Sequence, residues 1–160
     1  LDLARLGRRA RLERIYLVWG DDGLQRVILP IRGEGMWSTL YGFVALEDDL
    51  NTIGAATFYE QAETAGLGDQ ITSPAWLALW PGRALFGNDG AFRFRIAEGP
   101  VEPDSPAARH QVDGLTGATV TGSAVTALLR YWFGPHGYAP LLSRLEADPP
   151  QRQSTDRSDS

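Results

Sequence analysis

The first clear pattern of hydrophobic and polar positions lies near the N-terminus. Two runs rich in β-branched and aromatic residues, 15–19 and 24–31, are separated by Gly-Asp-Asp-Gly at 20–23. This arrangement is typical of a β-hairpin. Pro30 predicts that the second strand ends there or lies at an edge, because proline has no N–H to donate to a neighbouring strand.

Farther along the chain, strand patterns alternate with helix patterns. Apolar positions recur every three to four residues between 123 and 133, the spacing of one helix face. Ser73 followed by Pro74 is typical of the start of a helix, here a short one. The remaining predictions are strands at 40–46, 55–59 and 92–96, and a last helix at 139–147. Hairpins mixed with helices predict an α+β fold, not a doubly wound parallel sheet.

The pattern divides the 160 residues into three parts. Residues 1–13 predict a basic amphipathic helix, which is either a solvated helix face or a juxtamembrane segment that meets lipid head groups. Residues 14–148 predict one compact domain, since this length is ordinary for a single hydrophobic core. Residues 149–160 (PPQRQSTDRSDS) are polar and predict a disordered tail.

Composition and charge exclude several classes of protein. An apolar fraction of 43% argues against a wholly disordered chain. The absence of cysteine excludes a disulfide scaffold, thiol catalysis and thiolate metal sites, and with only His110 and His136 we expect no metal centre. A net charge of −5 argues against nucleic-acid binding, which needs a basic surface.

The sequence lacks the motifs of several enzyme classes. It contains no GxxxxGK[ST] phosphate loop, no HExxH and no GxSxG. The acidic pairs at 21–22 and 48–49 lie in predicted turns, which indicates solvated turn residues and not an acid/base pair.

One segment, residues 113–123 (DGLTGATVTGS), combines three glycines with four hydroxyl side chains directly before the strongest predicted helix. Glycines let a ligand approach the backbone, and the N-terminus of a helix favours an anion. Thr121 and Ser123 are candidate donors to such an anion. The same pattern also fits an N-cap and a turn that bind nothing.

A second candidate cluster combines residues 35–38 (GMWS) with residues 63–68 (ETAGLG). Trp37 and Leu67 have side chains that could face a planar aromatic cofactor. Their spacing alone favours an ordinary place in a hydrophobic core over contact with a cofactor, by about four to one.

Residues 113–119 (DGLTGAT) resemble the flavinylation motif, which reads Asp, two residues, Ser or Thr, then Gly-Ala-Thr. In that family the final threonine carries FMN through a phosphoester bond to its hydroxyl oxygen. The resemblance therefore implies covalent FMN on Thr119.

Further matches make the whole chain similar to the C subunit of the sodium-translocating NADH:quinone reductase family. The family usually has proline where Ala65 stands and leucine where Met36 stands. The matching segments are ILPIRGEGMWSTLYGFVAL (28–46), DLNTIGAATFYEQAETAGLG (49–68), SPAWLALWPGRALF (73–86) and YWFGPHGYAPLL (131–142).

The resemblance implies an electron-carrying flavin domain within a membrane complex. A single N-terminal transmembrane helix, upstream of Leu1, would tether it to the periplasmic side of the bacterial inner membrane. Its partners would be the other reductase subunits and a flavin transferase that attaches FMN using FAD as the donor. An electron carrier needs no acid/base residues from the protein, so no catalytic residues and no metal are expected.

The resemblance also implies the residues of the flavin site. Apolar side chains would surround the ring, and Glu63 and Thr64 would meet polar groups of the ring or the ribityl chain. Asp113 would either shape its loop or be read by the transferase. The full set around Thr119 is Asp113, Leu115, Thr116, Gly117, Ala118, Val120, Thr121, Met36, Trp37, Glu63, Thr64, Leu67 and Gly68.

Two other hypotheses remain open from the sequence. The flavoprotein subunit of Rnf-type electron-transport complexes shares the Gly-Leu-Gly and Gly-Ala-Thr elements, but it matches the GMWSTLYGF stretch less closely. A partner-binding module of the same fold without flavin is the third candidate. Yellow colour and in-gel fluorescence after denaturation would distinguish a flavoprotein from such a module.

Overall fold

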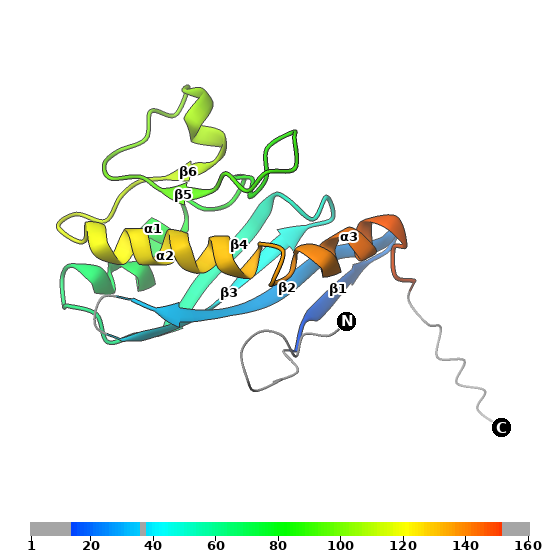
Figure 1. Cartoon of the computed structure of the whole chain (residues 1–160), viewed down its shortest axis with the longest axis horizontal. Helices are drawn as coiled ribbons and strands as arrows, with labels where there is room; N and C mark the ends of the chain where they lie inside the picture. Colours follow the sequence, from blue (N-terminus) through cyan, green and yellow to red (C-terminus); the bar gives the residue numbers. More distant parts are fainter. Residues whose placement is uncertain (1–13, 36–37, 152–160) are drawn as a thin grey trace.

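The computed structural model describes residues 14–35 and 38–151. The predicted helix over 1–13, Met36, Trp37 and most of the predicted tail lie outside these ranges. The first half of the chain forms a four-stranded antiparallel sheet in the order β1-β2-β3-β4 (Figure 1). Its strands are β1 (Tyr16–Gly20), β2 (Gly23–Glu34), β3 (Thr39–Glu47) and β4 (Ile53–Glu60). These strands confirm the four predicted from the first half of the sequence.

The second half supplies the helices and a small parallel strand pair. A short pair of strands, β5 and β6, replaces the longer strand predicted at 92–96: Arg95 and Ile96 form β5, and Phe92 makes an isolated bridge to Phe86. The last helix occupies the range predicted for it. The elements are η2 (Gly68–Thr72), α1 (Pro74–Leu77), β5 (Arg95–Ile96), η3 (Pro106–Arg109), β6 (Gln111–Val112), α2 (Thr119–Trp132) and α3 (Ala139–Ala147).

Helix α2 is the centre of the arrangement. It contacts β2 of the large sheet on one side and β5 of the small strand pair on the other (Figure 1). The apolar spacing that predicted this helix explains why, since most of its buried residues belong to the core that it shares with the sheet. Separate strand and helix layers around one core confirm the α+β class.

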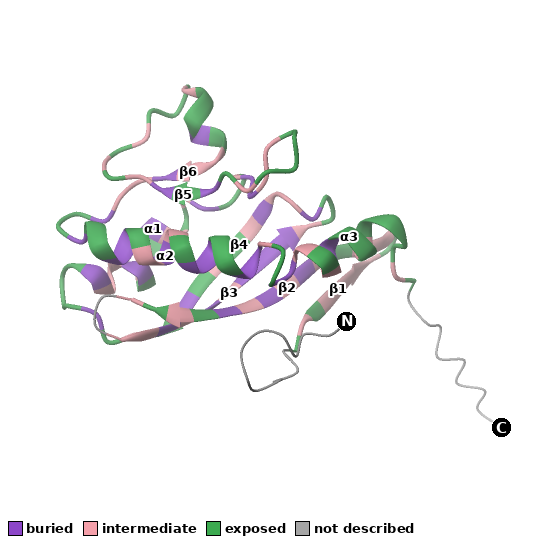
Figure 2. Ribbon diagram, viewed as in Figure 1, coloured by how far each residue is buried: buried purple, intermediate pink, exposed green. Residues whose placement is uncertain are grey.

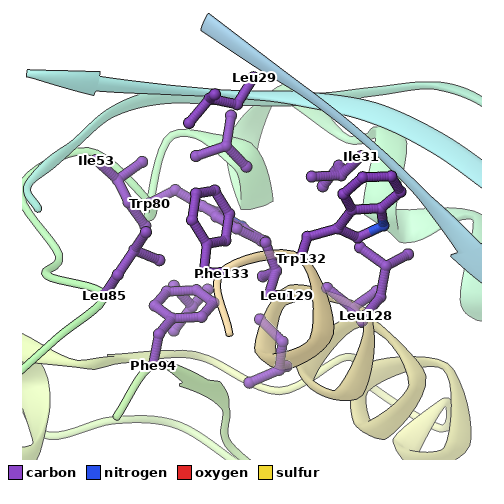
Figure 3. Close-up of a cluster of buried hydrophobic side chains, with 14 of the residues drawn as sticks. Leu29, Ile31, Ile53, Trp80, Leu85, Phe94, Leu128, Leu129, Trp132 and Phe133 are labelled. Atoms are coloured by element: carbon purple, nitrogen blue, oxygen red, sulfur yellow. The ribbon is translucent and has the colours of Figure 1, made fainter. Parts of the chain in front are cut away.

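The core lies between α2 and the inner face of the sheet (Figure 3). Alternate residues of β2, among them Leu29 and Ile31, point into it, as the two-residue period of a strand requires. Trp80 is fully buried at its centre, with its ring centroid 4.9 Å from that of Phe94. From α2 and the residue that follows it come Leu128, Leu129, Trp132 and Phe133.

Pro30 marks a local edge of the sheet and not the end of its strand. Pairing of β2 with β1 stops at Ile28, whereas pairing with β3 continues to Glu34. The prediction that the strand ends at Pro30 was wrong, and the alternative of an edge position was right. Beyond Ile28 no strand of the described residues covers this side of β2, so a residue without an N–H is tolerated there.

Aromatic side chains take the place of the missing strand at this edge. Tyr138 Oη donates to the carbonyl of Pro30 at 2.5 Å, and Trp132 Nε1 donates to the carbonyl of Arg32 at 2.7 Å. Carbonyl groups on the open side of a strand have no partner strand to supply a donor, and here side chains near α3 and on α2 supply it.

We expect Tyr138→Phe to lower the free energy of unfolding by about 1–2 kcal/mol, because the carbonyl of Pro30 would lose its buried donor. Tyr131→Phe is the matched control, since Tyr131 is 48% exposed. Urea unfolding of both variants measures the difference. Equal stability of the two variants would contradict a structural role for the Tyr138 hydroxyl.

In the described ranges, no helix has the length and apolar character needed to cross a membrane.

Candidate functional site

The N-terminus of α2 lies within the glycine- and hydroxyl-rich segment at 113–123. The helix begins at Thr119, four residues before the predicted start at 123. Ala118 is the N-cap residue, and no side chain caps the helix. The first N–H groups of a helix lack partners within the helix, and they form its positive end. The exposed Thr119 side chain therefore sits at an uncapped, positively polarised helix end.

A tight turn before Thr119 depends on Gly117. Its φ of 72° lies in the left-handed region, which side chains other than glycine rarely adopt. A Cβ on Gly117 would also lie 2.9 Å from Leu67 Cδ2. The left-handed backbone is what requires glycine here, and the short distance shows that the side chain of Leu67 lies directly against the turn.

The two clusters noted in the sequence meet at this turn. Gln70, in η2, donates from Nε2 to the carbonyl of Thr116 at 3.0 Å and to the carbonyl of Gly66 at 3.2 Å. Leu67 is 39% exposed beside the turn, and Thr116 is exposed as well. Sequence reasoning missed Gln70, because one glutamine in a polar loop carries no motif.

A buried carboxylate lies beneath the helix end. Glu63 and Thr121 are 7% and 2% exposed, and they are the buried polar or charged residues in the core of the described chain. Thr121 Oγ1 donates to Glu63 Oε1 at 3.3 Å, and Ser38 Oγ donates to Glu63 Oε2 at 3.2 Å. Glu63 thus joins three segments: the start of β3, the loop after β4 and the first turn of α2.

Two glycines leave room for this carboxylate. A Cβ on Gly35 would lie 2.2 Å from Glu63 Oε1, and a Cβ on Gly68 would lie 2.7 Å from Thr121 Oγ1. The Thr121 hydroxyl points inward to Glu63 and is not displayed at the exposed helix end. The backbone of the first turn and the hydroxyl of Thr119 are what the helix end presents.

Asp113 holds the start of the segment in place. Its Oδ1 accepts from the N–H of Val101 at 2.9 Å, and its carbonyl accepts from Trp76 Nε1 at 2.9 Å. These contacts fit the loop-shaping role considered for Asp113. Trp76 is a second residue that sequence reasoning missed, because it was noted only as part of a short helix.

The other expected site residues divide between the core and the surface. Leu115 and Ala118 are buried, whereas Val120 is 56% exposed. Thr64 is exposed, and its carbonyl closes a turn by accepting from the N–H of Leu67 at 3.1 Å. Met36 and Trp37 lie outside the described residues, so their expected contact with a ring stays a prediction.

The acidic pair at 48–49 lies in the turn between β3 and β4. Asp49 Oδ1 accepts from the N–H groups of Asn51 and Thr52 at 3.0 and 2.7 Å. Partial burial raises the pKa of Asp49, but hydrogen bonds from Thr52 and Asn51 outweigh it, so the pKa lies below its ordinary value. Asp49 is a turn residue, and the described ranges contain no group of three His, Asp or Glu side chains that could hold a metal ion.

Comparison with known proteins covers this whole site. The model of the FMN-binding domain family matches residues 35–134. The C subunit of the Na(+)-translocating NADH-quinone reductase from Pseudomonas aeruginosa is 47% identical over 144 residues, which is 90% of this chain and 55% of that protein. The same subunit from Neisseria meningitidis serogroup B is 42% identical over 147 residues, or 91% of this chain and 55% of that protein.

Solved structures agree with the sequence matches. The crystal structure of Shewanella oneidensis NqrC superposes with a TM-score of 0.81 at 40% identity, covering 92% of this chain and 67% of that one. The C subunit of the Na(+)-translocating NADH-quinone reductase from Parabacteroides distasonis superposes with a TM-score of 0.67 at 30% identity, covering 81% and 62%. The chain spans about half the length of the curated relatives it matches. Since the family model spans most of the fold and the N-terminal end of α2, the chain belongs to the FMN-binding domain family, and within it to the C-subunit type of the Na(+)-translocating NADH-quinone reductases.

Proposed function

We propose that this domain carries one FMN, joined to Thr119 Oγ1 by a phosphoester bond, and relays electrons within a Na(+)-translocating NADH-quinone reductase. The observation that carries the proposal is the position of Thr119. It is the first residue of an uncapped helix, exposed, and closely preceded by a turn that requires glycine.

The residues at this end suit a phosphate diester. The N–H groups of the first turn of α2 are free to donate to phosphate oxygens, and the helix dipole favours the negative charge. Gly117 keeps the backbone turn tight, and Ala118 adds little bulk beside the hydroxyl. The donor set at Thr119 therefore fits the group that the family implies.

Attachment is the transfer of the FMN group from FAD to the hydroxyl of Thr119. The hydroxyl oxygen of Thr119 forms a bond to the phosphorus of the FMN half of FAD, and the bond from that phosphorus to the AMP half breaks. AMP leaves with the bridging oxygen, and the hydroxyl proton passes to solvent. No electrons are exchanged in this step, so a flavin transferase and FAD are the only co-reactants required.

The remaining residues bind and orient. When bound, the isoalloxazine supplies the electron-transfer chemistry, which no side chain of the protein can supply. Leu67, which is 39% exposed, offers apolar surface beside the attachment end, whereas Leu115 is buried in the core. Gln70 donates to the carbonyl of Thr116 and so holds the turn in place. Glu63 braces the first turn of α2 through Thr121, so that Thr119 is held in one position.

The same proposal assigns the domain to a complex and to a side of the membrane. Relatives at 40–47% identity are named as the C subunit of this reductase, which favours it over an Rnf-type complex. We propose that residues 14–148 form the flavin domain, tethered by an upstream transmembrane helix on the periplasmic side of the inner membrane. The partners are then the other reductase subunits and the transferase that loads FMN.

Intact mass is the direct test. Co-expression of the chain with a flavin transferase is expected to add the mass of one FMN residue, with yellow in-gel fluorescence that survives denaturation. Expression without the transferase is the control and is expected to give the unmodified mass. An unmodified mass in both samples would contradict covalent flavin and favour a partner-binding module.

A further inference from the structure

A groove lies between β5 and α2, beyond the attachment end of the helix. Its volume is about 490 Å³, and its walls include Arg95 and Ile96 on one side and Ser123, Thr126 and Arg130 on the other. The N–H of Ile96 donates to Thr126 Oγ1 at 2.9 Å, so the strand and the helix hold fixed positions. The two walls of the groove are therefore fixed relative to each other by the fold.

The groove is positively charged on an acidic protein. Arg95 and Arg130 are exposed, and neither forms an ion pair within the described part of the chain, whereas Arg26 and Arg93 do. Glu98 is the one acidic side chain in the lining. Because the whole chain has a net charge of −5, two unpaired guanidinium groups here form a local site for negative charge.

The groove runs along the same helix that presents Thr119. Ser123 follows Thr119 by about one turn, roughly 6 Å along the axis, and Arg130 lies about 16 Å along it. Val120 and Tyr131, eleven positions apart and so on one side of α2, are 56% and 48% exposed. Figure 2 shows exposed residues recurring along α2 on the side away from the sheet.

We propose that this groove, with the exposed side of α2, docks an acidic surface of the protein that exchanges electrons with the domain. The inference rests on the proposed function, because it assumes a flavin at Thr119. Transient redox partners meet over small interfaces and are guided by complementary charge. Arginine and tyrosine are the residues that dominate such contacts, and both occur here beside the attachment helix.

The test uses the full subunit in its assembled reductase. Arg95→Glu and Arg130→Glu are combined, and stopped-flow absorbance follows reduction of this subunit's FMN after mixing with NADH. Sodium is held fixed while choline chloride sets the ionic strength. We expect the FMN of the double variant to be reduced about tenfold more slowly than that of wild type at low salt, because the groove then repels the acidic partner surface. The gap is expected to close at high salt, where screening shortens the reach of these charges.

The matched control is Arg144→Glu, which reverses an exposed arginine on α3, away from the groove. It is expected to stay within about twofold of wild type, as a surface change outside an interface does. If the double variant does not fold, Arg95→Gln and Arg130→Gln are compared singly, and each is expected to slow the step about threefold.

Two readouts separate failure of this inference from failure of the proposed function. Intact mass of the subunit reports whether FMN is attached. A wild-type subunit without FMN would overturn the proposed function and this inference with it. Attached FMN with unchanged rates in the double variant would overturn the docking surface alone. Unchanged rates together with loss of citrate binding, measured by calorimetry on the complex, would identify a small-anion site instead of a partner surface.

Discussion

Thr119→Ala is expected to abolish covalent FMN on this chain completely, even with the flavin transferase present. The side chain is exposed at the first position of α2, so its loss leaves no hydroxyl at the helix end. The change touches no buried contact, and we expect the free energy of unfolding to stay within about 0.5 kcal/mol of wild type. Intact mass and in-gel fluorescence measure attachment, and urea unfolding measures stability.

Neighbouring hydroxyls provide the controls for Thr119→Ala. Thr119→Ser keeps an oxygen at the same position and is expected to retain attachment in part. Thr116→Ala removes the Ser/Thr position of the flavinylation motif, so it is expected to lower the yield of attachment without abolishing it, because the acceptor oxygen of Thr119 remains. Retention of the added mass in Thr119→Ala, with its loss in Thr116→Ala, would move the attachment to Thr116.

Thr121 stands apart from these two threonines. Its side chain is 2% exposed and donates to Glu63, so it cannot serve as an acceptor of FMN without local unfolding. The sequence pattern could not reveal this, because Thr119 and Thr121 are both small hydroxyl residues before the same helix. The turn of the helix, which sets which side chain faces the core, separates their roles.

Strands of the first half were predictable because each has a strong local pattern. The β-rich runs at 15–19 and 24–31 and the turn between them at 20–23 identify the hairpin without tertiary information. The local pattern could not decide whether β2 ends at Pro30 or continues as an edge. The strand continues by pairing with β3, and the donors to its open side, Tyr138 and Trp132, lie about a hundred positions later. Such long-range contacts override the local preference of a proline.

The sequence predicted the chemistry of the candidate site, but not the buried contacts that hold it in place. Glycines and hydroxyls at 113–123 indicate an anion or cofactor segment from their composition alone. The buried bond between Glu63 and Thr121 joins residues 58 positions apart, and no spacing rule links them. The first turn of α2, which begins four residues before the predicted start, contains the Thr121 that makes this distant contact.

Gly114→Ala is expected to destabilise the domain by about 3 kcal/mol and to reduce flavinylation, because overpacking against backbone is costly. A Cβ at Gly114 would lie 2.5 Å from the carbonyl oxygen of Ala97 and 2.8 Å from the carbonyl carbon of Glu98. Both are backbone atoms beside the short strand pair, which cannot move as a flexible side chain can. The segment that begins at Asp113 must therefore shift, and Thr119 shifts with it.

Gly99→Ala is the matched control, because a Cβ there would meet nothing within 4 Å. The two glycines are joined by a hydrogen bond from the N–H of Gly114 to the carbonyl of Gly99, of length 3.0 Å. We expect Gly99→Ala to change the free energy of unfolding by less than about 1 kcal/mol, and in the stabilising direction. Urea unfolding ranks the two variants, and intact mass after co-expression with the transferase reports attachment. Wild-type stability in Gly114→Ala would mean that β5 and the segment at 113–119 are not packed as closely as these distances require.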